Sequence, residues 1–200
     1  MLHLRPSDYR LMPWKNGGGS TTELAIEPAG SSLADPFLWR VSSAQVGASG
    51  PFSGFPCYER SLVLVEGAGL ILDIEGKGRQ RLKHLGQVVT FSGDDAVGAT
   101  LIQGPCVDLG VISDPRRVKA TLEWITLGPN ATSITLAPTT LLIAPWGPVE
   151  VDPLRLELEN MECLCIGGAA EAPTLTAGSK LGLRAAMGTT PLVVVSLWPV

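Results

Sequence analysis

The stretch SLVLVEGAGLILDIEGKG, residues 61–78, decides the fold class of this chain. It holds two runs rich in branched aliphatic side chains, residues 61–66 and 70–75, and two glycines follow each run. Runs of this length bounded by glycine favour β-strands, and the glycines supply the positive φ angles that tight turns require. The stretch therefore predicts two strands joined by a short turn.

Short apolar runs separated by polar or glycine-containing turns continue on both sides of this stretch. No segment of twelve residues shows a competing helical period. Residues 113–117 are polar and contain a proline, which is typical of a connector. The sequence therefore predicts an all-β chain of two halves, residues 1–112 and 113–200. Further strands are expected at residues 21–26, 39–46, 87–91 and 99–102 in the first half, and at residues 120–127, 139–144, 148–151, 161–166, 180–184 and 192–198 in the second.

The composition is that of a packed, turn-rich globular protein. Of the 200 residues, 45% are hydrophobic and 17% are charged, and the chain holds 23 Gly and 16 Pro. The formal net charge of −4 offers no general attraction to phosphate, which argues against a nucleic-acid partner. The charged N-terminus lacks the apolar run of a signal peptide, and no stretch reaches the roughly 18 apolar residues of a membrane span. We therefore expect a cytoplasmic protein with no nucleic-acid or membrane partner.

Three consecutive glycines make WKNGGGSTTE, residues 14–23, the least ordinary stretch of the first half. Glycine allows backbone geometries and close approaches that other residues cannot adopt. One interpretation is an anion-binding nest, in which the N–H groups of Gly17 and Gly18 act beside Asn16 and Thr21. The other interpretation is a tight loop that leads into the next strand. A phosphate-binding P-loop is a poor match, because its G-x-x-x-x-G-K-[ST] spacing is absent.

The strand expected at residues 39–46 brings polar side chains to one face. A period of two places Arg40, Ser42 and Ala44 on the same side of that strand. Arg40 either holds a ligand carboxylate through its fork of donors or forms a structural ion pair, for which Glu23 is the nearest candidate. Both interpretations require a partner for Arg40, because an unpaired buried guanidinium is too costly.

Residues 50–60, GPFSGFPCYER, form an apolar loop that ends in an arginine. Phe52 supplies an apolar wall, and Ser53 and Arg60 supply polar groups. Small-ligand pockets combine such walls with a few placed polar groups. Packing within the loop is the alternative explanation for the aromatic side chains. We expect a small-molecule carboxylate as the ligand of this half.

Several kinds of chemistry lack the residues that they need. The chain has only two histidines, His3 and His84, so a metal centre with two or three histidines is not expected within one chain. No histidine base accompanies a nucleophilic serine or cysteine, and no G-x-S-x-G elbow occurs. Asp94, Asp95 and Asp108 could serve as acids or bases, although adjacent aspartates in a turn are usually solvated. We therefore predict no metal, no cofactor and no catalytic residue.

Taken together, these segments resemble the HutD/Ves family of bacterial cupin-like proteins. The resemblance covers the first 112 residues closely and in order, whereas the second half matches mainly in length and β character. The motifs that carry it are WKNGGGSTTEL (14–24), WRVSSAQV (39–46), GPFSGFP (50–56) followed by Arg60, FSGD (91–94) and GPCVDLGV (104–111).

The resemblance implies a double cupin-like barrel, or bicupin, of the RmlC-like jelly-roll type, with the pocket in residues 1–112 and a second barrel in residues 113–200. It also implies a regulator of histidine utilisation that binds an acidic intermediate such as N-formylglutamate or urocanate, and a homodimer. Two positions depart from the family pattern. Cys57 stands where glycine is usual, and LGVI at 109–112 replaces Phe-Asn-Val-Met, which removes a polar amide near the pocket.

Three functions remain open at this point. The first is a non-catalytic, small-molecule-binding regulator, which the sequence favours. The second is a metal-independent enzyme of the isomerase or lyase type, with Glu23 or Asp108 as general base and an arginine that stabilises the developing charge. The third is an interaction scaffold with a vestigial pocket. The predicted ligand-binding residues are Asn16, Gly17, Gly18, Thr21, Glu23, Arg40, Ser42, Phe52, Ser53 and Arg60.

Overall fold

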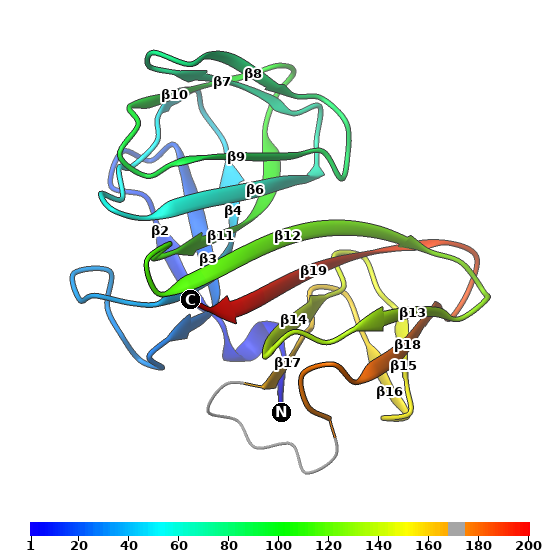
Figure 1. Cartoon of the computed structure of the whole chain (residues 1–200). Helices are drawn as coiled ribbons and strands as arrows, with labels where there is room; N and C mark the ends of the chain where they lie inside the picture. The colour runs from blue at the N-terminus through cyan, green and yellow to red at the C-terminus, as the bar shows by residue number, and fades with distance from the viewer. Residues whose placement is uncertain (168–174) are drawn as a thin grey trace. The chain divides into compact units, whose positions relative to one another are not determined.

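The chain folds almost entirely into β-strands (Figure 1). The computed structural model describes residues 1–167 and 175–200, which form nineteen strands and one 3-10 turn, Pro6–Asp8, without an α-helix. Within those residues no helix has the length and hydropathy needed to cross a membrane. The predicted all-β class is confirmed.

The chain forms two compact units. The N-terminal unit comprises Tyr9–Leu122 with Val200, and the C-terminal unit comprises Met1–Asp8 with Glu123–Pro199. The predicted division falls after residue 112, whereas the contacts divide the chain within strand β12 (Val118–Leu127). Met1–Asp8 belongs to the C-terminal unit because strand β1 pairs antiparallel with β17. The identity of each half as a cupin-like barrel stays a prediction.

Two antiparallel sheets make up the N-terminal unit. The six-stranded sheet has the order β2-β3-β4-β11-β6-β9, and the four-stranded sheet has the order β5-β10-β7-β8. The bounds are β2 (Arg10–Pro13), β3 (Gly19–Glu27), β4 (Trp39–Val46), β11 (Cys106–Ser113), β6 (Glu59–Glu66) and β9 (Val88–Ser92) in the first sheet, and β5 (Gly50–Pro51), β10 (Val97–Leu101), β7 (Leu70–Ile74) and β8 (Gly78–Leu82) in the second.

The core of the N-terminal unit collects alternate residues of these strands. Strand β6 contributes Leu62 and Leu64, which cluster with Leu70 and Leu72 of β7. Burial of each such side chain stabilises the fold by roughly 1.5–3 kcal/mol. Arg60 precedes Leu62 by two positions and shares its face of β6. The inner face therefore changes from apolar to polar toward the beginning of β6.

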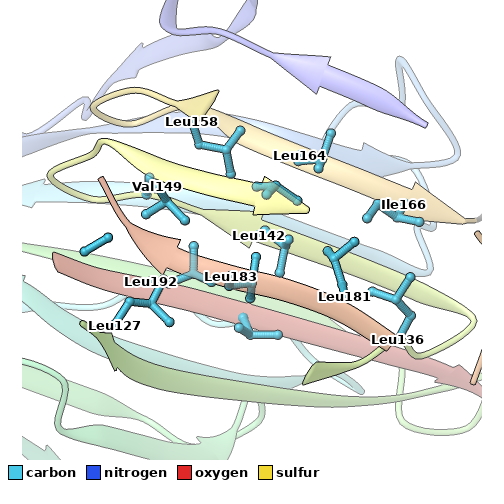
Figure 2. Packing of buried hydrophobic residues seen from close by; sticks show 14 residues of the cluster. Leu127, Leu136, Leu142, Val149, Leu158, Leu164, Ile166, Leu181, Leu183 and Leu192 are labelled. Atoms are coloured by element: carbon cyan, nitrogen blue, oxygen red, sulfur yellow. The ribbon is translucent and has the colours of Figure 1, made fainter. Parts of the chain in front are cut away.

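The C-terminal unit has a five-stranded sheet, β1-β17-β14-β19-β12, and a four-stranded sheet, β13-β18-β15-β16. Figure 2 shows its core, in which Leu142, Leu164, Leu183 and Leu192 point toward one another. All four side chains are fully buried, so this unit has an apolar core of its own. The remaining bounds are β1 (Leu2–Leu4), β13 (Thr132–Thr135), β14 (Thr139–Ile143), β15 (Val149–Asp152), β16 (Leu156–Leu158), β17 (Cys163–Gly167), β18 (Lys180–Ala185) and β19 (Thr190–Pro199).

Each of the twelve strands expected from the sequence overlaps a strand of the structure. The apolar pattern of the sequence does not predict the other seven strands, which are β1, β2, β5, β8, β11, β13 and β16. Strand β8 lacks an apolar run, because its residues before Leu82 are exposed and include two arginines. Strand β11 was missed because Asp108 and Gly110 interrupt its apolar run. This second omission matters, since β11 lies between β4 and β6 in the six-stranded sheet.

Candidate ligand-binding site

A cavity of about 590 Å³ lies inside the N-terminal unit. Its lining comes from the polar end of the six-stranded sheet, from the loop between β2 and β3, and from the loop that follows β5. This volume is within the range of roughly 300–1,000 Å³ typical of small-ligand sites. The polar and charged side chains in the lining are Lys15, Asn16, Thr21, Arg40, Ser42, Ser53, Arg60, Ser61 and Asp108, and the apolar lining includes Met12, Trp14, Leu33, Phe52, Phe55 and Leu62.

The register of the sheet explains how the polar residues meet. Ser42 of β4 lies opposite Gly110 of β11, with Asp108 opposite Ala44 and Ile112 opposite Arg40. Residues directly opposite each other share a face. The predicted face of Arg40, Ser42 and Ala44 is therefore the cavity face, and all three residues line the cavity.

Arg40 is buried and forms an ion pair with Glu23 of β3. Its Nε lies 2.6 Å from Glu23 Oε2, and only 3% of the arginine is exposed. Glu23 lies opposite Ser42, and a register shift follows it because Leu24 is an extra residue in β3. The structural ion pair with Glu23, one of the two interpretations of Arg40, is present. Arg40 is also one of the residues that line the cavity.

Arg60 lies among three aromatic rings at the beginning of β6. Its guanidinium carbon lies 5.4, 5.2 and 5.1 Å from the ring centres of Phe52, Phe55 and Phe91. Its Nη1 donates a hydrogen bond of 2.8 Å to the backbone oxygen of Ser53. Burial lowers the pKa of Arg60 to about 10, although nearby Asp108 opposes this change. The side chain therefore stays cationic at neutral pH in a fixed position.

Asp108 projects into the cavity from β11 and is only 5% exposed. Burial raises its pKa from 3.8 to about 7, and attraction to Arg60 limits the rise. Within the described part of the chain, its Oδ2 has no hydrogen-bond partner, and the same holds for Arg40 Nη2. Two residues of the cavity lining therefore each keep one buried polar atom, a donor in Arg40 and an acceptor in Asp108, without a protein partner among the described residues.

The glycine-rich stretch is a closed hairpin loop. Gly17 N–H donates to Trp14 O at 3.0 Å, and Gly18 N–H donates to Asn16 Oδ1 at 3.0 Å. Gly17 has a φ of +69°, and a Cβ on Gly19 would lie 2.2 Å from Gln45 O. Because both N–H groups are already used within the loop, the structure favours the tight-loop interpretation over the anion-binding nest.

Seven of the ten predicted ligand-binding residues line the cavity: Asn16, Thr21, Arg40, Ser42, Phe52, Ser53 and Arg60. Gly17, Gly18 and Glu23 are not among the described lining residues, and Glu23 instead pairs with Arg40. Asp108, predicted from the sequence only as a possible acid or base, also lines the cavity. The signal that could have placed it was the period of two in β11, which puts Asp108, Gly110 and Ile112 on one face.

No group of three or more His, Cys, Asp or Glu residues suited to a metal ion occurs in residues 1–167 and 175–200. His3 lies in the C-terminal unit, where its Nε2 is 2.7 Å from Glu162 Oε2. His84 is exposed after β8. The cavity in the N-terminal unit has no histidine in its lining.

The model of the HutD family matches residues 6–182. The chain belongs to the HutD family. A Pseudomonas putida relative named as an uncharacterized protein in the hutC 3′ region is 36% identical over 173 residues, which cover 84% of this chain and 87% of the relative. A Protein Ves from Citrobacter koseri is 38% identical over 117 residues, which cover 56% of this chain and 59% of that protein. The predicted relation to HutD and Ves proteins is confirmed.

Solved structures agree with this family assignment. HutD from Pseudomonas fluorescens SBW25 has a TM-score of 0.80 at 32% identity and covers 100% of this chain and 98% of its own. A conserved Pseudomonas aeruginosa protein of unknown function has a TM-score of 0.87 at 36% identity, with 98% and 97% coverage. At 7% identity, cupin-like YhhW from Escherichia coli still has a TM-score of 0.66, with 97% and 96% coverage. This last likeness concerns the fold alone, which is cupin-like.

Proposed function

We propose that this HutD-family chain is a non-catalytic, cytoplasmic regulator of bacterial histidine utilisation that binds an acidic small molecule. An intermediate such as N-formylglutamate or urocanate is the proposed ligand. Membership of the HutD family supports the link to histidine utilisation. The Pseudomonas putida relative, named for the hutC 3′ region, supports it independently.

The observation that carries the proposal is a cavity of ligand size with two guanidinium groups in its lining. Lys15 adds a third cation to the lining. Two anions lie beside these cations: Asp108 in the lining, and Glu23, which pairs with Arg40. Three cations against two anions favour an anionic ligand. This local balance outweighs the net charge of −4, because contacts within a pocket govern recognition there.

Arg60 is the residue best placed to hold a carboxylate. Ser53 and the three phenylalanine rings fix its side chain, so binding requires little additional ordering. A fixed guanidinium presents parallel N–H donors to a carboxylate, and such charge-assisted bonds are about twice as strong as neutral ones. The aromatic walls exclude water and strengthen the attraction.

The architecture part of the proposal is a bicupin, in which each unit is one cupin-like barrel. Two sheets in each unit support it. We also propose a homodimer, by analogy with cupin-like proteins. Size-exclusion chromatography with light scattering tests this part: a mass near 42 kDa, twice the 21.0 kDa chain, is expected, and a mass near 21 kDa would exclude the dimer.

Isothermal titration with N-formylglutamate, urocanate, histidine and glutamate tests the binding proposal. At least one acid is expected to bind with 1:1 stoichiometry. Replacement of Arg60 by alanine should weaken that binding by roughly tenfold to hundredfold, the equivalent of about 1.5–3 kcal/mol for a hydrogen bond to a charged group. Arg81→Ala is the matched control, because Arg81 is exposed on β8 and does not line the cavity. Absence of binding by all four compounds would contradict the proposal.

A metal-independent enzyme is the second candidate, and one observation favours it. Asp108 is buried beside Arg60 and has a pKa of about 7, which suits a general base near neutral pH. Glu23 is less suited to that role, because it is bound to Arg40. Sustained conversion of one of the acids by catalytic amounts of protein, followed by NMR and lost in Asp108→Ala, would favour the enzyme. Stoichiometric binding without product favours the regulator.

A further inference from the structure

Two residues of the cavity lining, Arg40 and Asp108, hold buried polar atoms that point to the chemistry of its ligand. Arg40 Nη2 is a donor and Asp108 Oδ2 is an acceptor, and neither has a partner among the described residues. The two residues are only 3% and 5% exposed. An unpaired buried polar group costs free energy, which a ligand recovers when it supplies the missing hydrogen bond. A ligand complementary to both atoms carries an acceptor and a donor.

The sheet register separates the backbone positions of Arg40 and Asp108 along the cavity floor. Arg40 and Arg60 lie on opposite sides of Ile112, because Ile112 pairs with both of them. Asp108 lies four residues earlier in β11, two steps along the same face, or about 13 Å between Cα atoms. By backbone position, the cavity floor therefore has a cationic end, where the two arginines begin, and an acceptor end, where Asp108 begins, while the Arg60 guanidinium lies near enough to Asp108 to lower its pKa.

Gly110 leaves the space between these two ends open. It lies midway between Asp108 and Ile112 on the same face, opposite Ser42, and it has no side chain. A larger residue there would occupy the floor of the cavity, and its Cβ alone would approach Ser61 O to 3.1 Å. A ligand can therefore extend over Gly110 from the arginines to Asp108.

From this arrangement we infer that the ligand carries an N–H donor, from an amide or a heterocyclic ring, at one end and a carboxylate at the other. Asp108 accepts the hydrogen bond from the N–H, and Arg40 and Arg60 hold the carboxylate. The inference rests on the proposed function, because it specifies the ligand class of the same cavity. It adds Asp108 as a residue that selects among acids. Acids without an N–H group leave Asp108 unpaired and bind less well.

The groups around Asp108 determine how this selection depends on pH. Arg60 faces it from β6, Arg40 and its partner Glu23 lie on β4 and β3, and Lys15 lies in the loop between β2 and β3. On its own strand, Cys106 has a pKa raised to about 11 by burial and by Asp108, so its thiol stays neutral. Asp108 is therefore the group that titrates near pH 7, and only its ionised form is a strong acceptor.

A matched pair of ligands tests the inference in the unmodified protein. N-formylglutamate carries an amide N–H, and 2-formyloxyglutarate, its ester counterpart, has an oxygen in that place. We expect the amide to bind at least about tenfold more tightly than the ester at pH 8, because the ester lacks the hydrogen bond to the charged carboxylate. The ratio of the two affinities should rise as pH increases from 6 to 8, because Asp108 ionises in that interval.

Variants then assign the effect to Asp108. In Asp108→Asn, the preference for the amide should shrink and become independent of pH. Asp73→Asn is the matched control, because Asp73 is an exposed aspartate of β7 outside the cavity, and it should behave like the unmodified protein. Equal affinities for amide and ester at pH 8, or a pH-dependent preference that survives in Asp108→Asn, would overturn the inference and leave the binding proposal intact. If neither ligand binds, and urocanate, histidine and glutamate do not bind either, both the inference and the binding proposal are overturned.

Discussion

Replacement of Asp108 by asparagine is expected to stabilise the N-terminal unit at pH 8 and to change its stability little at pH 4. The folded chain raises the pKa of this carboxyl from 3.8 to about 7, mainly through burial. At pH values between the unfolded pKa of 3.8 and the folded pKa of about 7, Asp108 is ionised in the unfolded chain and protonated in the folded chain. Stability therefore falls as pH rises through this window and levels off above it.

The size of the effect follows from the two pKa values. A tenfold change in proton affinity corresponds to about 1.4 kcal/mol, so the difference between 3.8 and about 7 corresponds to about 4 kcal/mol. Asparagine has nearly the same shape and carries no charge to bury. The stabilisation by Asp108→Asn should therefore grow from near zero at pH 4 to about 4 kcal/mol at pH 8.

Urea unfolding of the two proteins between pH 4 and pH 8.5 measures this difference. Hydrogen exchange of the β11 amides, measured in parallel, assigns the change to the N-terminal unit. Asp73→Asn serves as the control, since its exposed ion pair with Arg79 is worth at most about 1 kcal/mol. Parallel stability curves for the unmodified protein and Asp108→Asn, or a less stable variant at pH 8, would refute the argument.

Two further predictions concern the frame of the cavity. Arg40→Ala leaves Glu23 buried without its partner, so it should lower the free energy of unfolding by about 3–5 kcal/mol. Urea titrations measure this loss. A loss below about 1 kcal/mol would mean that the ion pair is not buried. Gly19→Ala places a Cβ 2.2 Å from Gln45 O and should lower the thermal midpoint by several degrees. Its control, Gly98→Ala in β10, meets nothing within 4 Å and should stay close to the unmodified protein; similar midpoints for both variants would contradict the close approach.

The apolar runs of the sequence were sufficient to locate twelve strands, because alternating or continuous branched side chains mark strands locally. Strands without this signal were missed. Strand β8 is exposed up to Leu82, with two arginines among its five residues, and lies at the edge of its sheet. Strand β1 is a short segment whose partner, β17, lies about 160 residues away. In both cases pairing with a neighbouring strand stabilises the segment, and local composition does not report that pairing.

The sequence by itself determined the all-β class, the family and the common face of Arg40 and Ser42, since these depend on local periodicity and on contiguous motifs. Only the tertiary structure decided that Asp108 lies on the same cavity wall. Its position opposite Ala44 depends on the pairing of β4 with β11, whose residues are more than sixty positions apart, and a slip of one residue would turn the carboxyl to the other face. The raised pKa and the unpaired Oδ2 follow from that burial, which no local pattern encodes.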